Sequence, residues 1–209
     1  MNGEHKKDLV ILVADADMEQ TMKGLLTRPR ALGIRDGITV DVFRHPRRDP
    51  GIFHEAHEFL RPLQGQYRYA LVMLDREGSG QEELSALEIE AEVQKRLNDS
   101  GWEGRSAVVV LDPELEVWVF SDSPHVIEVI ADGDERFYRE VLGTQLASGH
   151  GKPERPKEVM EEILRRKRIP RSSALYKELA ERVSFSKCLD PAFKRFRKNL
   201  QRWFPRGES

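Results

Sequence analysis

The sequence predicts an α/β fold in which a mainly parallel sheet is flanked by helices. Two observations support this prediction. Four short runs rich in Val, Ile and Leu are typical of strands, and segments with apolar residues at helical spacing separate them. The runs are almost continuously apolar rather than alternating, which indicates a sheet covered on both faces. Strands that alternate with helices indicate βαβ crossovers, which join parallel strands.

The expected elements follow one another in a regular order. The strands are expected at residues 9–15, 38–43, 69–75 and 106–112. Between them, the recurrence of apolar residues on one helical face predicts helices at 18–26, 53–63 and 82–99. After residue 113 the strand pattern fades, and we expect helices at 114–130, 158–170, 173–183 and 190–204. An alternative for residues 118–120, Trp-Val-Phe, is a short strand.

Charge and composition divide the chain into two expected parts. Residues 1–147 are expected to form the α/β domain, and residues 148–209 a helical, basic C-terminal extension packed on it. The net charge of the whole chain is −2, yet residues 151–209 hold 17 Lys and Arg against 8 Asp and Glu. An acidic first part suits metal binding and a basic second part suits contact with phosphate groups, while solvated surface is the alternative for both.

Cysteine content and hydropathy indicate the compartment. The chain has one cysteine, Cys188, so no intrachain disulfide can form, and no Cys/His pairing suggests a thiolate zinc site. The apolar run at residues 9–14 is too short for a signal-peptide core or a membrane span, and no later stretch approaches about 18 apolar residues. We therefore expect a soluble, cytoplasmic protein with no membrane partner.

Acidic residues follow three of the four expected strands. Asp15, Asp75 and Asp112 stand at the ends of the first, third and fourth strands, with Glu77 and Glu116 shortly after the last two. Ligands of open α/β sheets bind beyond the carboxyl ends of the strands, so these carboxylates are expected to gather there. Mg²⁺ prefers oxygen ligands and is a natural partner for them. The alternative, that each aspartate only caps a helix or a turn, stays open.

Three segments resemble a known family. Residues 75–78, DREG, stand where toprim-fold proteins carry a DxD-type acidic pair after the third strand. Residues 113–122, PELEVWVFSD, are similar to a "PEIEAWLLAD"-like segment, and residues 187–200, KCLDPAFKRFRKNL, to a "cpsF..fl..L"-like ending. Together they resemble a toprim-like family of unknown function related to the overcoming-lysogenisation-defect (OLD) nucleases. One departure is that VADADME replaces a Val-Glu-Gly turn, so that Ala14 stands in the glutamate position.

The resemblance implies a toprim-like fold and a metal-dependent nuclease with a role in phage defence. The catalytic residues and metal ligands would be Asp75, Glu77 and Glu116, with Asp15 in place of the missing glutamate. Mg²⁺ (or Mn²⁺) would activate water to hydrolyse nucleic-acid phosphodiesters, with Asp15 or Glu19 as general base. A basic run, otherwise a solubilising helix end, would contact the nucleic-acid backbone through Arg165, Arg166, Lys167 and Arg168.

Two other functions are compatible with the sequence. Because the family glutamate is missing, the chain could be a catalytically degenerate toprim subunit, which senses or docks within a defence complex beside a partner such as an ATPase. Residues 13–20, VADADMEQ, also resemble the DxD turn of haloacid-dehalogenase-type phosphatases, in which the first aspartate is a nucleophile and the second an acid or base. No convincing downstream lysine and "GDxxxD" segment follows, which disfavours the phosphatase hypothesis.

Overall fold

The computed structural model describes residues 7–121, 123–143, 152–184 and 188–207. At its centre lies a four-stranded parallel sheet in the order β2-β1-β3-β4. All four predicted strands are confirmed, as β1 (Lys7–Val13), β2 (Val40–Arg44), β3 (Tyr67–Asp75) and β4 (Ser106–Leu111). The central strands β1 and β3 are neighbours, with Ile11 opposite Leu71, so the loops that follow them emerge side by side.

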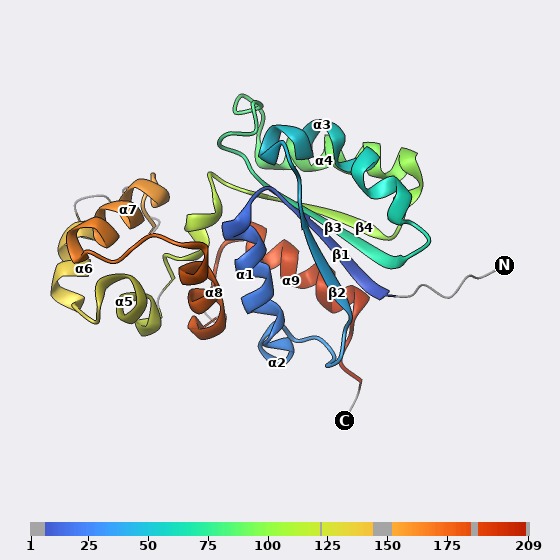
Figure 1. The fold of residues 1–209 in the computed structure, drawn as a ribbon. Coiled ribbons are helices and arrows are strands. Elements are labelled where there is room, and N and C mark those ends of the chain that lie inside the picture. The colour runs from blue at the N-terminus through green and yellow to red at the C-terminus, as the bar shows by residue number, and fades with distance from the viewer. Residues whose placement is uncertain (1–6, 122, 144–151, 185–187, 208–209) are drawn as a thin grey trace.

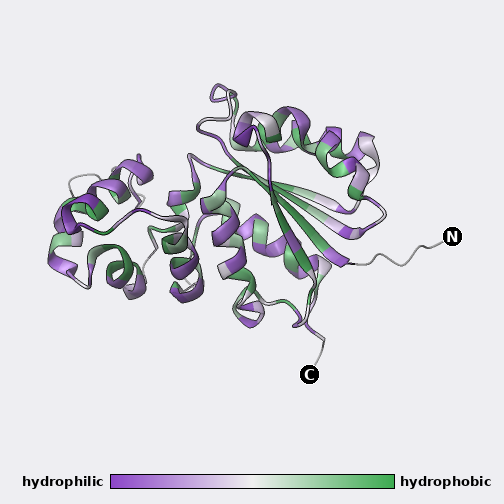
Figure 2. Ribbon diagram, viewed as in Figure 1, coloured by the Kyte–Doolittle hydropathy of each residue, from purple (hydrophilic) through white to green (hydrophobic). Residues whose placement is uncertain are grey.

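Helices cover both faces of the sheet (Figure 1). One face carries α3 (Arg48–Leu60) and α4 (Ala86–Leu97), and the other carries α1 (Ala16–Leu26) and α9 (Pro191–Trp203). The strands β1, β3 and β4 are buried along most of their length and hydrophobic there, as Figure 2 shows, whereas the edge strand β2 is only partly buried. The expected architecture, a parallel sheet flanked by helices, is therefore confirmed.

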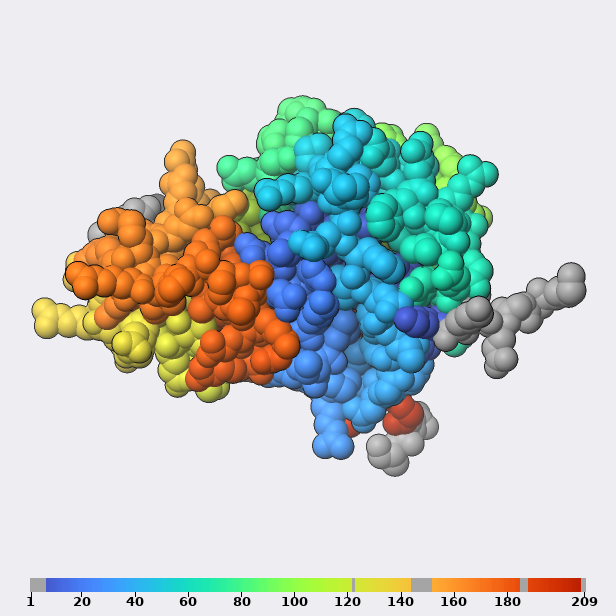
Figure 3. Space-filling model, in the orientation of Figure 1, coloured from blue at the N-terminus to red at the C-terminus, as the bar shows by residue number. Residues whose placement is uncertain are grey.

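Four further helices form a lobe beside the sheet, which we call the helical lobe (Figure 1). They are α5 (Pro124–Ala131), α6 (Glu135–Gly143), α7 (Pro156–Lys167) and α8 (Ser173–Arg182). The lobe joins the rest of the molecule where α8 packs against α1, and the two surfaces are continuous in Figure 3. Helix α9 leaves the lobe and returns to the sheet, beside the short helix α2 (Pro29–Leu32).

The prediction of a helix over residues 114–130 was wrong. Residues Leu115–Trp118 form a single 3₁₀ turn, η3, and a new helix, α5, begins only at Pro124. Proline cannot continue a helix from the preceding turn, but it is well suited to the first helical position. The alternative of a short strand at 118–120 was also wrong, because Trp118 ends the 3₁₀ turn and the two residues after it form no strand. Helices α2 and α6 were not predicted.

The remaining helix predictions were confirmed, and in α1, α4 and α9 local capping signals agree with the apolar pattern. Asp15 caps α1 by accepting a hydrogen bond from Met18, and Ser85 and Glu88 form a reciprocal capping box at the start of α4. Asp190 caps α9 in the same way, and Pro191 follows it at the first helical position. None of the helices in the described ranges is long and apolar enough to cross a membrane.

Helix α9 also protects the outer edge of the sheet at β4. The backbone N–H of Val110 donates a hydrogen bond of 2.9 Å to Oε1 of Glu90 on α4. Arg195 of α9 donates to the same oxygen at 2.8 Å, so the carboxylate is held between the strand and the guanidinium. An exposed edge strand offers unpaired backbone groups to other chains, and this ion pair covers one of them.

Candidate functional site: an acidic pocket at the carboxyl ends of the strands

The loops that follow β1, β2, β3 and β4 open a pocket at the carboxyl edge of the sheet. We call it the acidic pocket. Its carboxylates come from these loops and from the start of α7: Asp15, Asp49, Asp75, Glu77, Glu114 and Glu158. Basic side chains line the same pocket, namely Arg47, Arg48, Arg155 and Lys157. The strand order explains the convergence, because β3 lies between β1 and β4 and the chain leaves all three strands at the same edge.

Asp75, the last residue of β3, has a buried carboxyl oxygen that lacks a partner among the described residues. Its Oδ1 atom is buried and has no hydrogen-bond partner within the described structure. Burial raises the pKa of the Asp75 carboxyl well above its ordinary value, and the carboxylates of Asp49, Glu116, Asp15 and Glu114 raise it further. A buried acceptor without a donor is rare in folded proteins and requires an explanation, such as an ion or a water at that place.

Asp49 is a pocket residue that the sequence analysis missed. It lies in the first turn of α3, and its Oδ1 accepts the backbone N–H of Asp75 at 2.8 Å. Burial raises the pKa of Asp49 to about 6, and the charge of Asp15 acts in the same direction. Asp49 does not follow a strand directly, so the strand-end rule did not find it. The available signal was the Asp-Pro pair at residues 49–50, which is typical of a helix start.

Asp15 caps a helix and also lines the acidic pocket. As the N-cap of α1, it accepts the backbone N–H of Met18 through Oδ1 at 3.0 Å. It also lines the acidic pocket together with Asp75 and Glu77. Glu77 is exposed, and its backbone N–H is held by the carbonyl of Pro113 at 2.9 Å. The structure therefore brings together three of the four predicted site residues.

Glu116, the fourth predicted residue, lies in a different environment. Its side chain is 4% exposed, and it does not line the acidic pocket. The carboxylate accepts the hydroxyl of Tyr176 at 2.5 Å and Arg171 at 3.2 Å, and Arg171 also pairs with Asp17 at 3.0 Å. Glu116 is thus the acceptor in a buried network between η3, α1 and α8. It still adds to the negative potential at Asp75.

Glu114 occupies the pocket in the way that was expected of Glu116. It is 6% exposed, and its Oε1 accepts the backbone N–H of Lys157 in the first turn of α7 at 3.0 Å. The Nζ atom of Lys157 lies 3.7 Å from Oε2 of the same carboxylate. Burial raises the pKa of Glu114 to about 7, and the nearby Glu116 contributes to the shift. Glu114 therefore links the sheet edge to the helical lobe.

Asp112, the remaining strand-end aspartate, does not belong to the pocket. It is exposed and pairs with Arg76, with 2.8 Å between Nε and Oδ1. The position of a strand-end acid therefore did not by itself predict the site. Asp112 differs from Asp75 because its side chain points into solvent and has a cationic partner.

The basic run at residues 165–168 is only partly available to a ligand. Lys167 pairs with Asp134 at 2.6 Å, and Arg166 lies 3.6 Å from Glu140 and 3.7 Å from Glu162. Both cations also lie over the ring of Phe137. These contacts fasten α7 to α6. Arg165 and Arg168, the other two residues of the run, are exposed.

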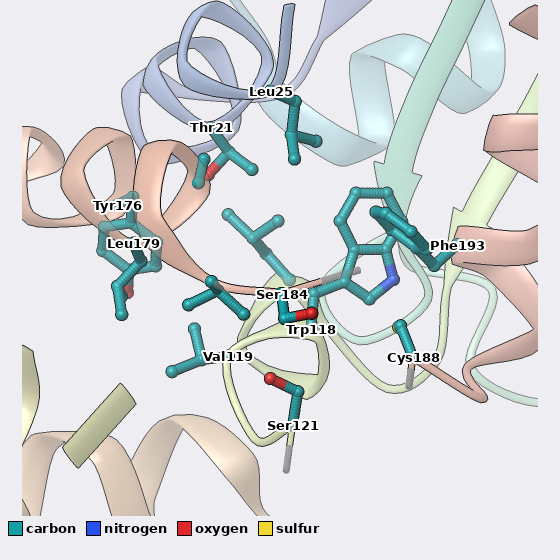
Figure 4. Close-up of a pocket in the computed structure, with 13 residues that line it drawn as sticks. Thr21, Leu25, Trp118, Val119, Ser121, Tyr176, Leu179, Ser184, Cys188 and Phe193 are labelled. Atoms are coloured by element: carbon teal, nitrogen blue, oxygen red, sulfur yellow. The ribbon is translucent and has the colours of Figure 1, made fainter. Parts of the chain in front are cut away.

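A second, apolar pocket lies between α1, η3, α8 and the start of α9 (Figure 4). Trp118 and Phe193 form one side of it, and Leu25, Leu179 and Val119 line other parts. Tyr176 belongs to this lining and also donates its hydroxyl to Glu116, so the apolar pocket adjoins the buried network behind the acidic pocket. Cys188 lines it as well, and burial raises the pKa of its thiol, as for a packed and unreactive cysteine.

Comparisons with protein-family models, with curated proteins and with solved structures found no match to this chain. Within the described ranges, no three or more His, Cys, Asp or Glu side chains are already arranged to hold a metal ion. The fold and the pocket together define the class: an α/β protein with a parallel sheet, whose carboxyl edge carries a pocket of carboxylates bordered by basic side chains.

Proposed function

We propose that this chain is a Mg²⁺-dependent, toprim-like nuclease that hydrolyses nucleic-acid phosphodiesters. The observation that carries the proposal is the buried, unpartnered Oδ1 of Asp75. Several carboxylates surround it, and all of them disfavour a negative charge at that atom. A bound cation would supply the missing partner and remove the repulsion at the same time.

The topology supports the toprim-like part of the proposal. Toprim-like proteins place an acid after the first strand and an acidic pair after the third. In this chain Asp15 follows β1, and Asp75 and Glu77 follow β3. The two strands are hydrogen-bonded neighbours, so their acids line one pocket. Toprim-like function in phage defence, and residence in the cytoplasm, are part of the same proposal.

The residues present fit a hard divalent cation. Every anionic group of the acidic pocket is a carboxylate, and oxygen is the ligand that Mg²⁺ prefers. Asp75 would hold the ion with Asp15 and Glu77, and Asp49 contacts the backbone of Asp75. Mg²⁺ (or Mn²⁺) would supply Lewis acidity and activate water for an in-line displacement at phosphorus. Glu116 would not bind the ion directly, but its buried carboxylate would add to the negative potential at Asp75.

The basic side chains of the pocket give the substrate a place to bind. Arg48 and Arg155 line the pocket beside the carboxylates, and Arg48 has no ion pair within the described ranges. Guanidinium groups bind phosphate oxygens with two parallel hydrogen bonds. Lys157 contacts Glu114 through its backbone N–H and its ammonium group, so the start of α7 lies at the same pocket. The chain would therefore orient a phosphodiester between two cations, Arg48 at the start of α3 and Arg155 before α7, and the carboxylates of the sheet edge.

A nuclease assay on matched variants tests the proposal. Labelled single-stranded DNA, duplex DNA and RNA would be incubated with wild type, Asp75→Asn and Asp112→Asn, in Mg²⁺ and in EDTA. We expect Mg²⁺-dependent cleavage by wild type and by the exposed control Asp112→Asn, and at least a hundredfold loss in Asp75→Asn, the order of a lost group that stabilises the transition state. Cleavage by Asp75→Asn at the wild-type rate would contradict the proposal.

One observation favours a second candidate function, a non-catalytic toprim-like subunit of a defence complex. Ala14 stands in the position of the family glutamate, and Asp15 already serves as the N-cap of α1. Such a subunit would bind partner proteins, such as an ATPase, in place of cutting nucleic acid. Affinity purification from the native cells, together with the assay above, separates the two: a stable partner and no turnover would favour the subunit.

The phosphatase hypothesis gains no support from the site. Asp17, which a phosphatase would need as its acid or base, is paired with Arg171.

A further inference from the structure

The outer face of α9 carries a line of free positive charge. The helix contains five basic and no acidic residues between Pro191 and Trp203. Its apolar side, formed by Phe193, Phe196, Leu200 and Trp203, is buried in the core. Lys194, Lys198 and Arg202 follow one another at four-residue spacing, so they share the opposite face, and all three are exposed. We call these three residues the α9 basic stripe.

The charges of the stripe are not neutralised within the protein. Arg195 and Arg197, which flank it, are engaged with Oε1 of Glu90 and with the carbonyl of Leu32. No ion pair to Lys194, Lys198 or Arg202 occurs within the described ranges. In the run at 165–168, by contrast, Arg166 and Lys167 are paired with acids.

The stripe runs along the molecule from the acidic end of the sheet to the opposite end. Helix α9 begins where Asp190 accepts the indole N–H of Trp118, in the segment that follows β4. It ends where the ring of Trp203 stacks on Tyr69 at 4.9 Å, near the start of β3. From Lys194 to Lys198 to Arg202 the helix rises by about 12 Å. Arg68 is exposed, and its guanidinium lies over the ring of Tyr69 at 5.3 Å.

We propose that the α9 basic stripe binds the sugar–phosphate backbone of the nucleic acid on which the acidic pocket acts. The inference rests on the proposed function and adds the surface that holds the polymer. A linear array of unpaired cations matches the linear charge of a nucleic-acid strand, and phosphate contacts of this kind position a protein without reading sequence. An anionic membrane fits less well, because a helix that inserts into a membrane needs a free apolar face, and that face of α9 is buried.

Three proteins test the inference: wild type, the stripe variant Lys194→Gln/Lys198→Gln/Arg202→Gln, and a control with equal loss of charge, Arg61→Gln/Lys95→Gln/Arg136→Gln. All three replaced control residues are exposed, and they lie after α3, on α4 and on α6, away from the stripe. Glutamine keeps a good helix propensity, and thermal melting and circular dichroism would verify the fold. Fluorescence anisotropy would measure binding to labelled single-stranded and duplex DNA in EDTA, and cosedimentation would measure binding to phosphatidylserine vesicles.

The stripe variant is expected to bind nucleic acid at least about tenfold more weakly than wild type, and the slope of log K against log salt should fall by about 2–3. The control should remain within about twofold of wild type. Equal affinity of stripe variant and wild type, no nucleic-acid binding by wild type, or stripe-dependent binding to vesicles alone would each overturn the inference. If wild type binds nucleic acid through the stripe but does not cleave it in Mg²⁺, only the proposed nuclease function is contradicted. If wild type cleaves nucleic acid but the stripe variant binds it with unchanged affinity, only the role of the stripe is contradicted.

Discussion

The backbone N–H of Asp75 donates a hydrogen bond of 2.8 Å to the carboxylate of Asp49, so the end of β3 and the start of α3 are joined through two acidic residues. This contact gives the Asp49 carboxylate a hydrogen-bond donor, but Oδ1 of Asp75 remains buried without a partner in the described part of the chain. Both carboxyls are easier to protonate than usual, because burial raises their pKa values. Such a pair is stable when a proton or a metal cation offsets the repulsion.

Asp75→Asn is expected to stabilise the metal-free protein. The substitution removes a buried charge that lacks a partner, and the free energy of unfolding at pH 7 should rise by about 1 kcal/mol or more. The same variant should lose the stabilisation that wild type gains from Mg²⁺, which would be about 2.7 kcal/mol when the free ion is at 100 times its Kd. Differential scanning fluorimetry with EDTA and with a Mg²⁺ series measures both effects. Asp112→Asn, which alters an exposed strand-end acid, should retain the wild-type response.

Stability without metal is expected to fall as the pH rises through the acid range. The pKa of Asp49 is about 6 and that of Glu114 about 7 in the folded protein, both above their ordinary values. Between about pH 4 and pH 7 the folded state therefore binds more protons than the unfolded chain, and the free energy of unfolding declines with pH. After allowance for solvent screening, we expect a loss of about 1–2 kcal/mol across this window.

Urea unfolding in EDTA at several pH values would measure this decline. Asp49→Asn and Glu114→Gln should each flatten it, because each removes one of the carboxyls that take up a proton on folding. Added Mg²⁺ should stabilise more at the upper end of the window, where the carboxylates are ionised. A wild-type stability that rises steadily from pH 4 to pH 7 would show that the pocket carboxyls are not protonated in the folded state.

Glu116 is expected to behave as a structural residue in metal-binding experiments. Tyr176→Phe removes the hydroxyl that donates to its buried carboxylate and should cost about 1–2 kcal/mol of stability. The Mg²⁺-induced shift in melting temperature should be almost the same in Tyr176→Phe and wild type, since neither Tyr176 nor Glu116 lines the acidic pocket. Loss of the Mg²⁺ response in Tyr176→Phe, with the fold intact, would restore Glu116 as a ligand.

Asp190 is expected to be the most sensitive capping position. Its Oδ1 accepts both the N–H of Phe193 at the start of α9 and the indole N–H of Trp118, each at 3.0 Å. Asp190→Ala should therefore cost about 2–3 kcal/mol, from the lost cap and the unsatisfied indole. Asp190→Asn keeps one acceptor oxygen and should cost less. Denaturant unfolding followed by tryptophan fluorescence would rank the two variants, and equal stability of Asp190→Ala and wild type would exclude this role.

The sequence was sufficient to predict the parallel sheet, because continuous apolar runs and alternating helices depend on local pattern. It was less informative where tertiary contacts decide. The pattern of residues 114–130 resembled a helix, yet Ser123 and Pro124 divide it. Asp15 and Asp75 were placed correctly by the rule that acids follow strands, but Asp112 obeys the same rule and faces solvent.

Two pocket assignments required coordinates. Asp49 reaches the site from a helix start, through a hydrogen bond to a residue 26 positions away, and no local signal reports such a contact. Glu114 and Glu116 are two positions apart, and only the packing of α7 and α8 determines which one faces the pocket. Sequence resemblance selected Glu116, whereas the structure places Glu114 there.

An anomalous-scattering map from crystals soaked in Mn²⁺, which substitutes for Mg²⁺ and can be located by its own signal, would test the proposed metal site. We predict an ion within about 2.0–2.3 Å of Oδ1 of Asp75, with oxygen ligands from neighbouring pocket carboxylates. A map with no Mn²⁺ at Asp75 at millimolar ion and neutral pH, or with the ion held only by residues outside the acidic pocket, would show that Asp75 is not a metal ligand.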